Sequence, residues 1–178
     1  VIVPSEYMKH LLGLEAHVIP TGVDTRWFDK CAETEDFFLY LGRISAEKSV
    51  DMLIEVFSER EDVLKIDGKG PMLEILRKKA TKNIQFLGYV PDYELPKLYS
   101  SAKGFIMPSK TDTQGLVILE AMACWTPVIG RKATAIPEFV KDGYNGYLFE
   151  GKEDLHEILD KYEKTEKLSR NARKTAEK

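Results

Sequence analysis

Short apolar segments with the length of β-strands alternate along the chain with segments of helical periodicity, and this alternation limits the fold more than any other feature. After the run at 37–41, for example, Val50, Leu53, Ile54 and Phe57 recur at helical spacing. Strands that alternate with helices form a parallel sheet with helices on both faces. We therefore expect a three-layer α/β/α fold with a parallel sheet. The six strand-like runs are FFLYL (37–41), VLKI (63–66), IQFLGYV (84–90), GFIM (104–107), PVI (127–129) and GYLF (146–149).

Composition agrees with one compact domain and excludes several classes of protein. The 178 residues are 43% hydrophobic, which is enough for a single core. A net charge of -3 argues against a surface built for nucleic acid or anionic lipid. Cys31 and Cys124 form no C-x-x-C pair, so neither a disulfide scaffold nor a zinc site is indicated. No apolar run approaches the length of a membrane span. These features predict a soluble protein of the reducing cytoplasm.

The ends of the chain differ from its centre. The chain begins with Val, and VIVPSEYMKHLL is typical of a strand end that runs into a helix, so we expect an excerpt of a longer protein. Residues 1–16 would then be the tail of a preceding domain, and 17–28, with its Pro and Gly, a connector. We expect the main domain at 29–165 and a truncated C-terminal helical segment at 166–178.

In parallel α/β sheets, ligands bind beyond the carboxyl ends of the strands. The loop LGRISAEK places Arg43 and Lys48 between a strand and the start of a helix. Together with the unpaired N–H groups of a helix start, the two cations suit a phosphate group. The alternative is that both are solvated surface charges, as most Lys and Arg side chains are.

The stretch TDTQGLVILEAMAC carries two acids on either side of a predicted helix start. Gly115 lies where the helix should begin, so a ligand could approach the backbone closely. Glu120 lies about one and a half turns further on, and it can look back toward Asp112. The alternatives are that Glu120 pairs with a neighbouring Lys or lies at the surface, and that Asp112 caps the helix. A Glu within an apolar run needs a polar partner, and a ligand hydroxyl would serve.

Five blocks occur in an order and spacing that resemble the C-terminal domain of retaining GT-B glycosyltransferases, the glycosyltransferase group 1 family. The resemblance covers roughly residues 17 to 165 and implies a Rossmann-like fold, the C-terminal half of the GT-B architecture. The blocks are LGRISAEKSVD, GKGP, NIQFLGYVPDYEL, PSKTDTQGLVILEAMAC with TPVI, and IPEFVKDGYNGYLF.

The resemblance also implies roles for the residues already singled out. Glu120 would hold the ribose hydroxyls of a nucleotide-sugar, and Asp112 would lie near the sugar and its phosphates. Arg43 and Lys48 match the family's diphosphate-binding pair, which makes these two and Asp112 the catalytic candidates. The backbone of Val90 would meet the base.

Further donor-binding candidates follow from the same resemblance. Gly42 lies beside the diphosphate-binding pair, and Gly115 opens the helix whose Leu116 and Val117 amides would bind phosphate. Because an Arg, a Lys and a helix terminus can stabilise a leaving diphosphate, we expect no cofactor and no obligatory metal ion. The histidines are scattered without ligand spacing, and we assign them no catalytic role: His10, His17 and His156.

Three positions depart from the family pattern. Asp112 replaces the usual Glu, so its carboxylate lies about one methylene short. Trp125 stands where the family has Gly, and Thr134 with Ala135 replaces a Gly-Gly pair. A lost Gly changes how closely a loop can approach the donor, and a Trp must bury its ring or cover a surface.

The sequence therefore predicts the donor half of a retaining hexosyltransferase that is inactive without its missing acceptor domain. Mannose from GDP-mannose is the preferred donor by resemblance, with a UDP-hexose as the other choice. The acceptor would be a glycan or a lipid-linked hydroxyl, held by the missing domain, which could also bring the protein to the membrane periphery. A non-catalytic nucleotide-binding or assembly module, favoured by Trp125 and Thr134 with Ala135, is the alternative from another class. A nucleotide-sugar epimerase is the third reading.

Overall fold

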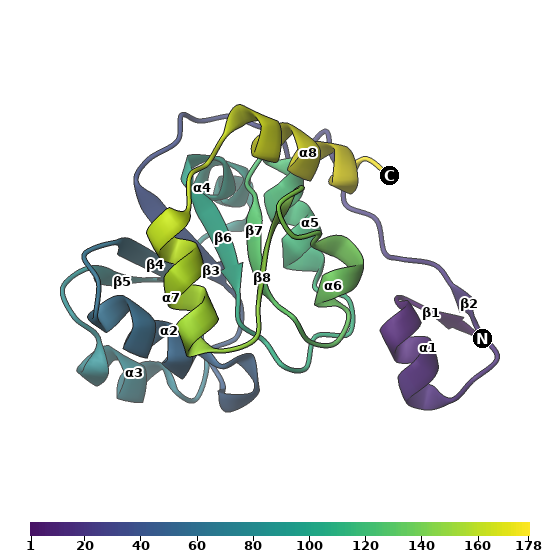
Figure 1. Ribbon diagram of the computed structural model, residues 1–178, viewed down its shortest axis with the longest axis horizontal. Coiled ribbons are helices and arrows are strands. Elements are labelled where there is room, and N and C mark those ends of the chain that lie inside the picture. The colour runs from purple at the N-terminus through teal and green to yellow at the C-terminus, as the bar shows by residue number, and fades with distance from the viewer.

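The computed structural model describes all residues, 1–178, and contains one six-stranded sheet in the order β5-β4-β3-β6-β7-β8 (Figure 1). Every neighbouring pair in this sheet is parallel. The strands are β3 (Phe37–Leu41), β4 (Val63–Asp67), β5 (Ile84–Gly88), β6 (Gly104–Met107), β7 (Val128–Arg131) and β8 (Gly146–Phe149).

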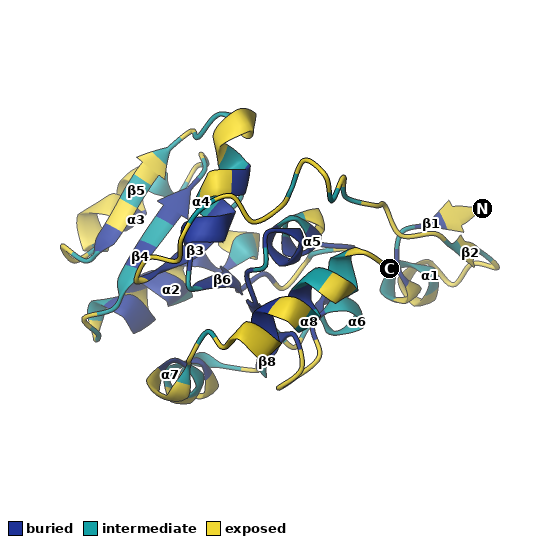
Figure 2. Ribbon diagram, turned by 90° about the horizontal axis from the view of Figure 1, so that it is seen from above, coloured by how far each residue is buried: buried dark blue, intermediate teal, exposed yellow.

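Helices cover both faces of this sheet, so the predicted three-layer α/β/α fold is confirmed. Figure 2 shows α2 and α7 on one side of the sheet and α4 on the other. The first face carries α2 (Val50–Ser58), α3 (Leu73–Lys79) and α7 (Lys152–Lys161). The second carries α4 (Leu95–Ser101), α5 (Leu116–Ala123), α6 (Ile136–Phe139) and α8 (Glu166–Ala176). Two short 3-10 helices, η1 (Ala46–Lys48) and η2 (Asp92–Glu94), lie just before α2 and α4.

The central strand β3 divides its side chains between two cores. Phe38 and Tyr40 belong to the core under α2, α3 and α7, whereas Phe37 and Leu39 belong to the core under α4, α5 and α8. Successive residues of a strand point to opposite faces, so a continuous apolar run is what a strand between two helix layers needs. All four side chains are at most 2% exposed.

Three strands have bounds that differ from the sequence prediction. We predicted 63–66 for one of them, but β4 extends to Asp67. We predicted a strand to residue 90, but β5 ends at Gly88, which has a φ of 83°. Few other residues adopt that conformation, and it turns the chain out of the sheet. We predicted 127–129 for the next-to-last strand, but it runs from Val128 to Arg131. Pro127 has no N–H group to contribute to a ladder, which favours the later start.

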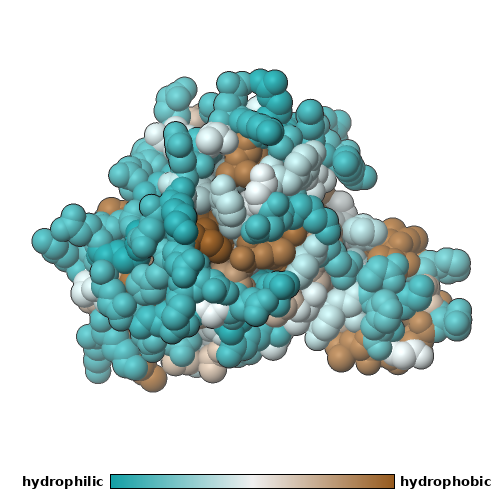
Figure 3. Space-filling model, in the orientation of Figure 1, coloured by the Kyte–Doolittle hydropathy of each residue, from teal (hydrophilic) through white to brown (hydrophobic).

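The first residues form a small unit beside the main body. Its strands β1 (Ile2–Val3) and β2 (His17–Val18) pair in parallel and flank α1 (Glu6–Leu12). Apolar side chains gather on its surface at the right of Figure 3, and Leu11 and Ile19 are more than half exposed. The division of the chain at residues 16, 28 and 165 remains a prediction.

Three side chains tie the first segment to the main body. The Glu138 carboxylate of α6 accepts hydrogen bonds from the Glu6 and Tyr7 N–H groups at 3.0 and 2.8 Å. Ser5 Oγ donates to the Thr113 carbonyl oxygen, and Gln114 Nε2 donates to that of Thr21 at 2.8 Å. Two of these ties end on the loop between β6 and α5.

Arg173 of α8 holds the next part of the connector. Its Nη1 donates to the carbonyl oxygens of Phe28 and Ala123 at 2.9 and 2.7 Å, and its Nη2 to that of Thr25 at 3.0 Å. The chain near residues 25–28 is therefore fixed against α5 and α8.

None of the helices is long and apolar enough to cross a membrane.

Candidate functional site

The loops that follow β3 and β4 interlock at the carboxyl edge of the sheet. The Gly42 N–H donates to the Asp67 carbonyl oxygen at 3.1 Å, and the Ile44 N–H donates to that of Lys69 at 2.9 Å. A Cβ on Gly68 would lie 1.9 Å from the Gly42 oxygen, and one on Gly70 would lie 2.1 Å from the Ile44 oxygen. The glycines of DGKGP thus let two loop backbones touch.

Lys48 and Asp112 meet at this edge although they lie on different loops. Lys48 ends η1, and Asp112 lies in the loop between β6 and α5. Lys48 Nζ is 3.0 Å from Oδ1 and 2.9 Å from Oδ2 of Asp112. The two side chains are 23% and 14% exposed, so water screens the pair only in part. The structure therefore brings together two of the three predicted catalytic candidates.

Arg43 lies on the same loop as Lys48 and remains unpaired. The residue is exposed, and its guanidinium takes part in no salt bridge. Its carbonyl oxygen accepts from the Tyr40 hydroxyl at 2.9 Å, which fixes the backbone and leaves the side chain free. A hydrogen bond from Ser45 lowers the pKa of nearby Glu47, and the charges of Arg43 and Lys48 add to that shift. Glu47 therefore lies close enough to both cations to be affected by their charge, and Arg43 is the one of the two that forms no salt bridge.

The helix α5 begins as the sequence predicts. Gly115 is its N-cap, with φ 73° and ψ 57° in the left-handed region. No side chain caps the helix, so the prediction's alternative role for Asp112 as a cap is wrong. Leu116 is 38% exposed and Val117 is half-buried. The first N–H groups of a helix have no partner within the helix. In α5 these groups directly follow the loop that carries Asp112.

Glu120 has a protein partner that the sequence did not reveal. Its Oε2 accepts a hydrogen bond from the Tyr99 hydroxyl at 2.9 Å. Tyr99 is fully buried in α4, 21 residues away along the chain. Burial raises the pKa of Glu120, the Tyr99 bond opposes that shift, and the charge of Asp92 adds to it. The polar partner expected for this acid is thus present, and it is neither a neighbouring Lys nor open solvent.

Asp67 is a further acid at the carboxyl edge, and sequence analysis missed it. The residue is only 5% exposed, and its Oδ1 accepts a hydrogen bond from the Val90 N–H at 3.1 Å. Burial raises the pKa of this carboxyl. Asp67 therefore fixes the strand end at which the base was predicted to bind. An acid directly after the apolar run VLKI was the available signal.

Two of the positions that depart from the family pattern have unusual backbone conformations. Trp125 has a φ of 62° and Thr134 a φ of 54°, the left-handed region that glycine adopts most easily. Thr134 lies in the loop after β7, at the carboxyl edge. Trp125 lies between the end of α5 and the start of β7, at the opposite edge of the sheet. The expected effect of Trp125 on the donor loops is therefore not supported by its position.

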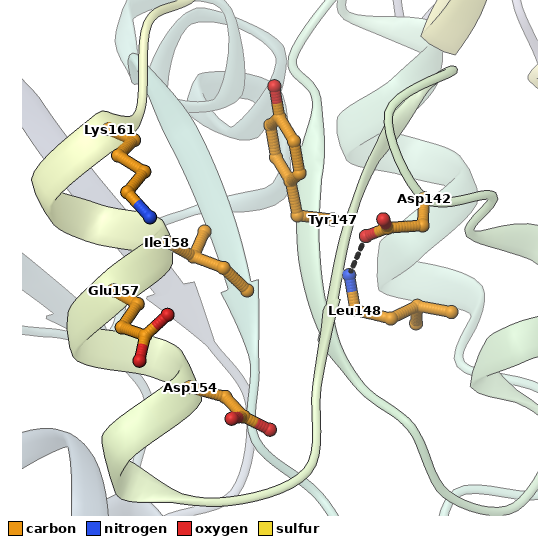
Figure 4. A pocket seen from close by; sticks show the side chains of 7 residues that line it. All are labelled: Asp142, Tyr147, Leu148, Asp154, Glu157, Ile158 and Lys161. Carbon is orange, nitrogen blue, oxygen red and sulfur yellow. Dashed lines mark hydrogen bonds between the residues drawn. The ribbon is translucent and has the colours of Figure 1, made fainter.

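Other polar sites lie apart from this edge. Figure 4 shows a cavity of about 280 Å³ between α7 and the last strand, with acidic side chains on both walls. Asp142 Oδ1 accepts a hydrogen bond from the Leu148 N–H at 2.9 Å, so this carboxylate binds the backbone of the edge strand β8. No group of three or more potential metal-binding side chains occurs in the chain. His10 contacts the Glu6 carbonyl oxygen within α1. His156 of α7 lies 3.2 Å from Glu59 at the end of α2, so both histidines have neighbours outside the carboxyl-edge loops.

Comparisons with known proteins identify relatives of this chain. The chain is 31% identical over 186 residues to the alpha-monoglucosyldiacylglycerol synthase of Streptococcus pneumoniae, which covers 87% of this chain and 42% of that protein. It is 32% identical over 177 residues to a GDP-mannose-dependent alpha-(1-6)-phosphatidylinositol monomannoside mannosyltransferase of Mycolicibacterium smegmatis, which covers 83% and 44%.

Solved structures share the fold. Anabaena HepE in complex with UDP and glucose superposes with a TM-score of 0.84 at 21% identity, over 99% of this chain and 57% of that one. The C-terminal domain of the glycosyl transferase group 1 family protein LpcC of Francisella tularensis has a TM-score of 0.74 at 23% identity, over 88% and 97%.

The chain spans less than half of the length of these two curated relatives. Its residues 24–178 match the family described as Glycosyl transferases group 1. Since this match extends from the connector to the last residue and the fold agrees with it, the chain belongs to the group 1 glycosyltransferase family.

Proposed function

We propose that this chain binds the nucleotide-sugar donor of a retaining hexosyltransferase at the carboxyl edge of its sheet. The observation that carries the proposal is the meeting of Lys48 and Asp112, from two separate loops, beside the unpaired Arg43. The uncapped start of α5 belongs to the same loop as Asp112. Cations and free N–H groups in one place suit a diphosphate.

The same groups supply the chemistry that such a transfer needs. When the bond between sugar and diphosphate breaks, negative charge develops on the leaving phosphate. Arg43, Lys48 and the α5 amides of Leu116 and Val117 can stabilise this charge without a metal ion. Asp112 holds the Lys48 ammonium group in place and lies where the transferred sugar would bind.

Mannose from GDP-mannose is our preferred donor. The mycobacterial relative that is named as GDP-mannose-dependent supports this choice, and the fold shared with a complex of UDP and glucose supports the wider class of nucleotide-sugars. The names of the two curated relatives include the lipid terms diacylglycerol and phosphatidylinositol. They support a lipid-linked or glycan acceptor. The acceptor groups would lie outside this chain, so the chain alone should bind donor and transfer no sugar.

Calorimetric titration with GDP and with UDP tests the proposal. We expect saturable binding of at least one nucleotide, and weaker binding by about 10- to 100-fold in Lys48→Met, since a hydrogen bond to a charged group contributes about 1.5–3 kcal/mol. Tighter binding of GDP would support the mannose assignment, and tighter binding of UDP would contradict it. The absence of binding of either nucleotide at millimolar concentration would remove the donor site itself.

A pair of substitutions tests the assignment of Glu120 to the ribose. Glu120→Gln keeps the shape and loses the charge, so we expect nucleotide affinity to fall by about 1 to 3 kcal/mol, or roughly 5- to 150-fold. Tyr99→Phe is the matched control, because it removes the hydrogen bond from the Tyr99 hydroxyl to Glu120 and leaves the Glu120 carboxylate. It should lower the melting temperature and preserve affinity. Equal losses of affinity in both variants would identify Glu120 as a structural partner of Tyr99.

A further inference from the structure

A second cavity, of about 430 Å³, lies at the amino-terminal edge of the sheet. It is opposite the donor loops, which are the loops after β3 and β4 and between β6 and α5, where we propose that the donor binds. Its walls come from the connector, the end of α5 and the segment between α7 and α8. Ala102 and Thr126, which precede β6 and β7, lie at its base through their contacts with Lys164. The lining residues are Lys30, Thr34, Cys124, Trp125, Lys164, Glu166 and Ser169.

Two lysines face this cavity without a counter-ion. Lys164 is half-buried, and its Nζ donates to the Ala102 carbonyl oxygen at 2.8 Å and reaches Thr126 Oγ1 at 3.5 Å. Neither Lys164 nor Lys30 forms a salt bridge, although an ammonium group that loses part of its contact with water, as that of Lys164 does, is normally paired. Burial lowers the pKa of Lys164 to about 8, and repulsion from Lys30 adds to the shift. At neutral pH the cavity therefore carries positive charge that nothing in the chain balances.

The acids nearby are engaged elsewhere. Glu166, which lines the cavity, pairs with Arg170 one turn along α8. Asp29 Oδ1 accepts from the Trp125 indole N–H at 3.1 Å and lies 3.2 Å from Arg173 Nη1. Cys124 adds no charge, because burial raises the pKa of its thiol to about 12. An anion that balances these lysines would therefore come from outside the chain.

Neutral groups in the wall are suited to hold such an anion. Ser169 is only 7% exposed, and its hydroxyl makes no hydrogen bond within the chain. Its hydroxyl can therefore donate a hydrogen bond to a ligand oxygen that enters the cavity. The Trp125 ring forms another part of the wall, held by its bond to Asp29.

We propose that this cavity is a binding site for a phosphate monoester, held by Lys30, Lys164 and the Ser169 hydroxyl. Two ammonium groups match the charge of a monoester, which approaches -2 at neutral pH. The hydroxyl supplies a further donor to a phosphate oxygen. This site lies across the sheet from the donor loops and does not depend on the function proposed for them.

Calorimetric titration of the chain with inorganic phosphate, against chloride at matched ionic strength, tests the site. We expect Lys164→Met and Lys30→Met each to weaken phosphate binding about 10-fold or more, because each removes a charge-assisted hydrogen bond. Lys167→Met is the matched control, since Lys167 is an exposed lysine of α8 outside the cavity, and it should bind as the unchanged chain does. Lys30 is exposed, so its variant should fold even if Lys164→Met does not.

Phosphate could also bind at the donor loops, and one further variant separates the two sites. Arg43→Met should leave the phosphate isotherm of the cavity intact. If Arg43→Met abolishes phosphate binding while Lys164→Met and Lys30→Met preserve it, the anion binds at the donor loops and the proposal is wrong. The absence of phosphate binding in the unchanged chain overturns it as well.

The monoester could be a free metabolite or the headgroup of a lipid. Sedimentation with phosphatidylcholine vesicles that contain phosphatidic acid distinguishes these sources. Sedimentation that requires both Lys30 and Lys164 assigns the site to a headgroup. Phosphate binding without sedimentation assigns it to a soluble phosphate.

Discussion

Arg43→Ala should slow sugar transfer by roughly 30- to 1000-fold when measured in the complete transferase that carries this chain. Lys48 pairs with Asp112, whereas the Arg43 guanidinium forms no salt bridge. Removing it should raise the barrier by about 2 to 4 kcal/mol, the loss typical of a group that stabilises charge in the transition state. Steady-state kinetics with a saturating acceptor would measure the effect.

The fold should survive this substitution, because the Tyr40 hydroxyl contacts the Arg43 backbone and not its side chain. Arg77→Ala is a suitable control, since Arg77 is an exposed Arg on α3 that pairs with Glu74 at 3.4 Å. It should transfer sugar at the unchanged rate. An unchanged rate in Arg43→Ala as well would make Arg43 an ordinary surface charge.

Gly70→Ala should destabilise the domain by about 3 kcal/mol, which corresponds to a melting temperature lower by roughly 6 to 12 °C for a domain of this size. The new Cβ would lie 2.1 Å from the Ile44 carbonyl oxygen, a separation that backbone atoms cannot tolerate. The two loops must then part. Because Arg43 precedes Ile44 on one of them, nucleotide affinity should fall together with stability.

Gly22→Ala provides the control for this comparison. A Cβ on Gly22 would meet nothing within 4 Å, so the melting temperature should change little. Calorimetric melting of both variants, with and without nucleotide, measures the two effects. A Gly70→Ala variant as stable as Gly22→Ala would show that the contact between the two loops is not required.

Periodicity alone predicted the sheet well because both faces are covered. Strands such as FFLYL lie between two helix layers and are apolar throughout, so their composition identifies them without knowledge of their neighbours. Their ends were harder to place. The end of β5 depends on the positive φ of Gly88, and a glycine letter does not reveal its φ.

The candidate site was predictable where it depends on one loop and missed where it depends on contacts between loops. Gly115 could be placed at a helix start from its own neighbourhood. The bonds from Tyr99 to Glu120 and from Val90 to Asp67 join residues 21 and 23 positions apart, across different elements. No spacing rule connects such positions, and only the packing of α4 against α5 brings the first pair together.

The ties between the first segment and the loop before α5 have a mechanical consequence. Residues 25–28 are anchored by Arg173, whereas the chain before them is held mainly through Ser5, Gln114 and Glu138. Two of those three anchors end on residues 113 and 114, next to Asp112 and Gly115. A displacement of residues 1–18 would therefore be transmitted through Ser5 to the loop between β6 and α5. This loop carries Asp112, the partner of Lys48, and directly precedes α5.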